Sequence, residues 1–70
     1  MRSLLSGSAE TKAKELGATR PYVRGIAWVW STGFPTEAKA KEFVAWLEAN
    51  CYEHRGVYKV DSLGYNVRWR

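Results

Sequence analysis

The stretch that decides the fold is residues 22–51, which read YVRGIAWVWSTGFPTEAKAKEFVAWLEANC. Its first part, residues 22–31, is rich in β-branched and aromatic residues and predicts a strand, which ends at the turn-forming residues 32–35. Thr36 follows as the predicted N-cap of a helix over residues 37–50. The apolar residues of that helix recur at helical spacing and predict one buried stripe, made of Ala40, Phe43, Val44, Leu47 and Cys51.

The predicted strand over residues 22–31 carries apolar side chains on both of its faces, which favours a central place in the sheet. Alternation puts Trp28 and Trp30 on one face, together with Ile26. Two interpretations of these tryptophans stay open. Either they belong to the core, or they are exposed and bases could stack between them if they point the same way as Arg24.

The last fifteen residues alternate with a period of two, which predicts a β-hairpin that turns at Leu63-Gly64. A two-residue loop there would pair Ser62 with Tyr65, Val60 with Val67, and Tyr58 with Trp69. This register would gather the apolar side chains on one face. The opposite face would then carry Val57, Lys59, Asp61, Asn66, Arg68 and Arg70.

Residues 1–20 are predicted to form an N-terminal arm or a marginal helix, with Ser8 as its N-cap and Gly17 as its end. Only Ala9, Ala13 and Leu16 could face a core. Residues 21–70 are predicted to form a single α+β domain. The expected architecture is a three-stranded antiparallel sheet in the order strand, helix, strand, strand, with the main helix packed on one face.

Composition limits the possible functions. The chain has 70 residues, which allows one core, and its 46% hydrophobic content excludes a disordered protein. A single cysteine and a single histidine predict no disulfide, no metal site and no cofactor. No stretch is long enough for a signal peptide or a membrane span, so we expect a cytoplasmic protein, in the cytosol of a host cell, without a membrane partner.

A catalytic role would have to use Cys51 and His54, which lie three residues apart near the end of the predicted helix. Cys51 is expected to complete the buried stripe of that helix, where a thiol is usually inert. His54 is expected in a turn, and no third group to orient it can be identified. The sequence therefore predicts a protein that is not an enzyme and has no catalytic residues.

Positive charge points to a binding surface. The net charge of +4 favours anionic partners. The predicted hairpin gathers Lys59, Arg68 and Arg70 on one face, and Arg55 and Arg24 could extend it. Trp46, on the flank of the helical stripe, is a candidate anchor residue. The alternative is that these cations only keep an exposed sheet soluble.

A second hypothesis places nucleic-acid binding in residues 12–26, which resemble the middle of a bacterial helix-turn-helix motif. In that arrangement the Leu16-Gly17 turn would separate a support helix from a recognition helix. Arg20, Tyr22 and Arg24 would face the major groove, and the terminal hairpin would act as a wing.

The order and spacing of the elements expected in residues 22–70 resemble those of small phage-encoded host-takeover inhibitors, such as anti-CRISPR proteins and phage inhibitors of host RNA polymerase. The resemblance lies in a strand that ends near Gly33, a helix opened by residues 36–38 that carries Phe43 and Trp46, and a hairpin that starts at residues 56–60. It implies a non-catalytic inhibitor that occludes a host protein or ribonucleoprotein complex. Direct binding of DNA or RNA is the alternative, and an exposed apolar strand face would suggest a homodimer.

Overall fold

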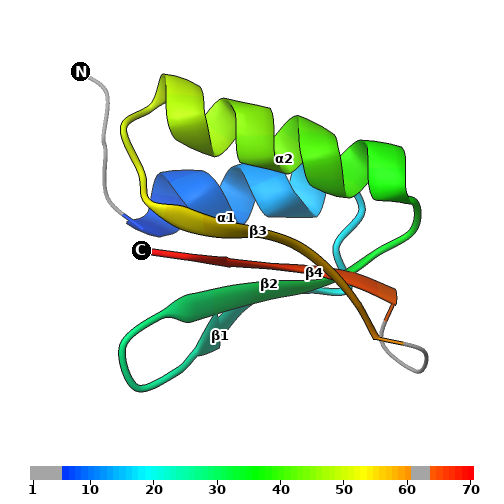
Figure 1. Ribbon diagram of the computed structural model, residues 1–70, viewed down its shortest axis with the longest axis horizontal. Helices are drawn as coiled ribbons and strands as arrows, with labels where there is room; N and C mark the ends of the chain where they lie inside the picture. The colour runs from blue at the N-terminus through cyan, green and yellow to red at the C-terminus, as the bar shows by residue number, and fades with distance from the viewer. Residues whose placement is uncertain (1–5, 61–63) are drawn as a thin grey trace.

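The computed structural model describes residues 6–60 and 64–70. The strands form a four-stranded antiparallel sheet in the order β1-β2-β4-β3, and both helices lie on the same face of it (Figure 1). The predicted α+β class is confirmed, but the sheet has four strands rather than three. In chain order the elements are α1 (Ser6–Glu15), β1 (Arg20–Arg24), β2 (Val29–Phe34), α2 (Glu37–Ala49), β3 (His54–Val60) and β4 (Gly64–Trp69).

The additional strand arises because residues 22–31 do not form one continuous strand. The N–H of Gly25 donates to the carbonyl of Trp28 at 2.8 Å, and this bond closes a tight turn around Ile26 and Ala27. The tip of this turn is apolar, so it lacks the polar residues that usually mark a loop in a sequence. The helix-turn-helix hypothesis is also wrong for this segment, because β1 is an extended strand where a recognition helix was expected.

The register of the terminal hairpin differs from the predicted one. Val57 pairs with Val67, Tyr58 with Asn66, and Val60 with Gly64. The predicted partner of Val67 was Val60, so the pairing is shifted by three residues, and this odd shift moves Val57, Tyr58 and Lys59 to the opposite face from the predicted one. The predicted pair of Ser62 with Tyr65 lies outside the described residues.

Both helices bury most of the side chains expected of them, but Val44 is only half-buried. Ala9 and Ala13 of α1 are fully buried, as are Ala40, Phe43 and Leu47 of α2. The hydroxyl of Thr36 accepts a hydrogen bond from the backbone N–H of Lys39 at 3.2 Å, which confirms the predicted N-cap. Cys51 is exposed rather than buried, because α2 ends at Ala49 and Cys51 turns the chain with a left-handed φ of 64°.

The core lies between the sheet and the helices, around Trp69. The Trp69 ring is 1% exposed and meets the edges of Tyr22, Phe43 and Tyr52 at centroid distances between 5.5 and 6.4 Å. Phe34 packs on Phe43 at 5.3 Å. None of the helices in the described part of the chain is long and apolar enough to cross a membrane.

Candidate functional site

The face of the sheet opposite the helices carries aromatic rings and arginines. Both helices lie on the other side (Figure 1). Because paired residues share a face, the pairs Val29–Trp69 and Ser31–Val67 belong to the core side, and the pair Trp30–Arg68 belongs to the open side. We call the following set the aromatic–arginine face: Trp28, Trp30, Arg55, Tyr58, Arg68 and Arg70.

Arg68 sits at the centre of this face, between two rings from neighbouring strands. Its guanidinium carbon lies 4.4 Å from the centroid of Trp30 on β2 and 5.3 Å from that of Tyr58 on β3. The two rings are perpendicular, with centroids 6.4 Å apart. The Nε atom of Arg68 is buried and has no hydrogen-bond partner, and no carboxylate of the described residues forms an ion pair with this side chain. The rings therefore hold a guanidinium whose charge is not neutralised.

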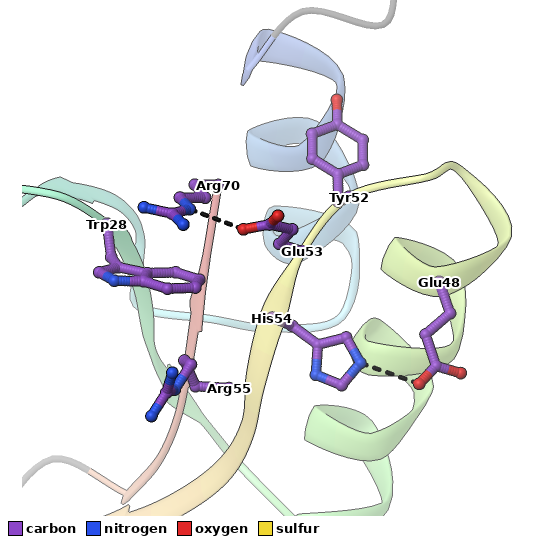
Figure 2. Close-up of a pocket in the computed structure, with 7 residues that line it drawn as sticks. All are labelled: Trp28, Glu48, Tyr52, Glu53, His54, Arg55 and Arg70. Carbon is purple, nitrogen blue, oxygen red and sulfur yellow. Dashed lines mark hydrogen bonds and ion pairs between the residues drawn. The ribbon is translucent and has the colours of Figure 1, made fainter.

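The reverse arrangement, one ring between two arginines, occurs at Trp28 near the end of β4. Its ring lies between the guanidinium groups of Arg70 and Arg55, which are 4.2 and 5.6 Å from its centroid (Figure 2). Arg70 Nε donates to Glu53 Oε1 at 2.7 Å, so the charge of Arg70 is partly balanced. Arg55 has no such partner in the part of the chain that the structure describes.

An open hollow of about 520 Å³ adjoins Trp28, and we call it the Trp28 hollow. His54 lies on the side of α2, where its Nε2 and Glu48 Oε2 are 2.8 Å apart (Figure 2). The backbone N–H of Gly56 donates to His54 Nδ1 at 3.1 Å, so a neutral ring carries its proton on Nε2 and donates it to Glu48. Burial raises the pKa of the Tyr52 hydroxyl. The hollow is lined by Trp28, Glu48, Tyr52, Glu53, His54, Arg55 and Arg70.

The excess of positive charge is concentrated in the sheet. The helices α1 and α2 together contain four lysines and five glutamates. The four strands contain five lysines and arginines and no aspartate or glutamate. The net charge of the chain is therefore carried by the strands and their ends, and the helical layer is close to neutral.

The structure brings together three of the predicted site residues, Arg55, Arg68 and Arg70. Arg24 pairs with Val29, and Lys59 pairs with Tyr65 and lies 5.9 Å from the centroid of its ring. Val29 and Tyr65 both pack against the core, so Arg24 and Lys59 lie at opposite edges of the helix-bearing face instead.

Trp46 does not belong to the aromatic–arginine face. Its ring stacks on Phe43 at 6.4 Å and contacts Tyr52 at 5.6 Å, on the side of the helices. The tryptophan is half-buried and extends the core, so its position gives no support for an anchor beside the arginines.

Trp28, Trp30 and Tyr58 are the residues of the site that the sequence analysis did not assign to it. Tyr58 was expected on the apolar face because the predicted register was wrong. For Trp28 and Trp30, a core position and an exposed position had both stayed open. The signal that identifies Trp30 and Tyr58 is their pairing across β4, since Trp30 is opposite Arg68 and Tyr58 is opposite Asn66.

Within residues 6–60 and 64–70, no group of three or more His, Cys, Asp or Glu side chains could hold a metal ion. The exposed thiol of Cys51 belongs to the turn after α2, whereas His54 is engaged with Glu48. Comparison with protein-family models, curated proteins and solved structures gives no match for this chain.

Proposed function

We propose that the protein binds single-stranded nucleic acid on its aromatic–arginine face. The observation that carries the proposal is Arg68, held between Trp30 and Tyr58 on a sheet face that neither helix covers. A guanidinium makes strong charge-assisted hydrogen bonds to phosphate. Aromatic side chains stack on bases, and each stacked base contributes about 1–3 kcal/mol. The face combines both kinds of contact.

The rings around Arg68 restrict its conformation before a ligand binds. An exposed arginine loses rotamer freedom when it binds, and this loss costs about 0.5–1.5 kcal/mol for each immobilised side chain. Trp30 and Tyr58 already restrict Arg68 in the free protein, so most of that cost falls on folding rather than on binding. The absence of a carboxylate partner among the described residues means that no ion pair has to be broken first.

A single strand suits this surface better than a duplex. A helix that reads a duplex enters its major groove, whereas here both helices lie behind the sheet. The rings of Trp28, Trp30 and Tyr58 are half-buried on a sheet surface, and bases can stack on such rings only when they are not paired inside a duplex.

The experiment compares two faces of one sheet. Fluorescence anisotropy with a labelled oligothymidine of about ten nucleotides measures affinity. We expect the double variant Arg55→Gln, Arg68→Gln to bind about tenfold more weakly or worse, because two charged contacts are lost. The matched control is Arg24→Gln, Lys59→Gln, which removes the same charge from the helix-bearing face and should change affinity by less than about threefold.

Equal losses in the two double variants would mean that binding depends only on net charge, and would reject this face. Occlusion of a host complex by a phage-encoded inhibitor remains a separate prediction. It would be favoured over our proposal if wild-type protein binds no oligonucleotide and retains a protein complex from a nuclease-treated bacterial lysate.

A further inference from the structure

The Trp28 hollow contains an acid in a place where an acid opposes phosphate binding. Two glutamates line the hollow: Glu48 is held by His54 on the side of α2, whereas Glu53 lies beside Arg70 of the aromatic–arginine face. Glu53 and Arg70 exchange two backbone hydrogen bonds of 3.0 Å, and their side chains meet at 2.7 Å. Backbone and side chain together fix the acid next to the guanidinium.

The pair offers one donor group and two acceptor oxygens beside the hollow that both residues line. The Arg70 guanidinium donates, and the Glu53 carboxylate accepts through two oxygens, of which Oε1 already receives Arg70 Nε. The Watson–Crick edge of guanine offers the complementary row, because O6 accepts while N1–H and the N2 amino group donate. In adenine, cytosine and thymine an acceptor lies next to each donor on that edge, so one carboxylate oxygen would face a lone pair.

We propose that the Trp28 hollow selects an unpaired guanine within the bound strand, with Glu53 and Arg70 reading its Watson–Crick edge. This inference rests on the proposed function and names a base preference for the same surface. Trp28 lines the hollow with its ring between Arg70 at 4.2 Å and Arg55 at 5.6 Å (Figure 2), so a base stacks on this ring by displacing Arg55, the more distant of the two. Arg55, which lines the hollow and has no acidic partner among the described residues, is placed to bind a phosphate of the same nucleotide.

The test uses three labelled strands that differ at one central position: thymidine alone, one guanine, or one inosine, which is guanine without the N2 amino group. We expect wild-type protein to bind the guanine strand about tenfold more tightly than the thymidine strand. The affinity for the inosine strand should lie between the other two, because inosine keeps N1–H and O6 but lacks the N2 amino group that would donate to Glu53.

Glu53→Gln is the decisive variant, because it keeps the size of the side chain and replaces one acceptor oxygen by a donor group. It should bind the guanine and thymidine strands with nearly equal affinity and should bind thymidine at least as well as wild type does. Glu42→Gln, at an exposed position of α2, removes the same charge and should keep the guanine preference. Thermal unfolding of both variants checks that they are folded.

The outcomes separate the two proposals. Wild-type protein that binds all three strands equally would overturn the guanine site and leave single-strand binding intact. A guanine preference that persists in Glu53→Gln would also overturn it, because the carboxylate would then not read the base. Absence of binding to every strand would reject the proposed function itself, and the guanine site with it.

Discussion

The indole N–H of Trp69 donates a 2.7 Å hydrogen bond to the hydroxyl of Ser31, and that hydroxyl donates in turn to the carbonyl of Pro21 at 2.7 Å. Ser31 is completely buried, and Trp69 is 1% exposed. The short chain of hydrogen bonds joins β4, β2 and β1 beneath the aromatic–arginine face. It therefore fixes the strands whose outer side carries the candidate site.

Replacing Ser31 by alanine should destabilise the protein by about 1–3 kcal/mol, because the buried N–H of Trp69 loses its acceptor. Urea denaturation followed by circular dichroism measures the change in the free energy of unfolding. Trp69→Phe and the double variant complete a thermodynamic cycle. The two substitutions should cost less together than the sum of their separate effects, and strict additivity would contradict the coupling.

Gly33 and Gly56 have nearly the same backbone conformation but different surroundings, with φ of 83° and 84°. A Cβ on Gly56 would meet nothing within 4 Å, so Gly56→Ala should cost about 1–2 kcal/mol for the left-handed conformation alone. A Cβ on Gly33 would lie 1.8 Å from Thr19 Oγ1 and 3.0 Å from the Thr19 backbone nitrogen. Gly33→Ala should therefore cost a further ~1–3 kcal/mol from overpacking. If urea denaturation gives the same loss in the free energy of unfolding for Gly33→Ala and Gly56→Ala, the Thr19 side chain moves aside without cost.

The salt dependence of binding measures how many phosphate groups the protein contacts. For a single strand, the slope of log K against log salt changes by about 0.7 for each contact. Arg68→Gln should make the slope shallower by about that amount between ~50 and 200 mM salt. Lys59→Gln, a cation of the same sheet on the helix-bearing face, should keep the wild-type slope. An unchanged slope in Arg68→Gln would mean that Arg68 binds no phosphate.

Burial raises the pKa of Tyr52 above its ordinary value of 10.0, because it disfavours the charged phenolate. As the pH rises past 10.0, the unfolded chain releases this proton before the folded protein does. The free energy of unfolding should therefore fall between 10.0 and the pKa of the folded protein. Tyr52→Phe should remove this contribution, so that urea denaturation at increasing pH gives a shallower decline. Identical declines in the two proteins would contradict the assignment.

The main helix could be predicted because its local signals agree. Thr36 supplies the cap, and the apolar stripe predicts which side of the helix is buried, so α2 begins at Glu37 as expected. The N-terminal helix was predicted as marginal, but the three residues expected to face the core are buried: Ala9 and Ala13 of α1, and Leu16 directly after it. Small side chains carry a weak sequence signal, yet they let a helix pack closely.

The sheet could not be derived in the same way, because its apolar residues lie on both faces. A period of two identifies the two sides of a strand but does not tell which side is covered. Trp30 and Tyr58 are as apolar as the core residues around them, and the irregular pairing at Gly56 changes the parity of β3. The face on which the helices pack determines which aromatic rings lie beside Arg68 on the open face. That packing is a tertiary property, which the local sequence does not specify.

The strand order has a consequence for how the protein folds. The pairs β1–β2 and β3–β4 are hairpins with short connections, whereas the pairing of β2 with β4 joins residues 29–34 to residues 65–69 across the whole of α2. Closing that long loop reduces chain entropy before the contacts between the two strands form. The pairing of β2 with β4 should therefore limit the folding rate. Substitutions along this central junction should slow refolding, whereas substitutions in β1 or β3 should mainly accelerate unfolding.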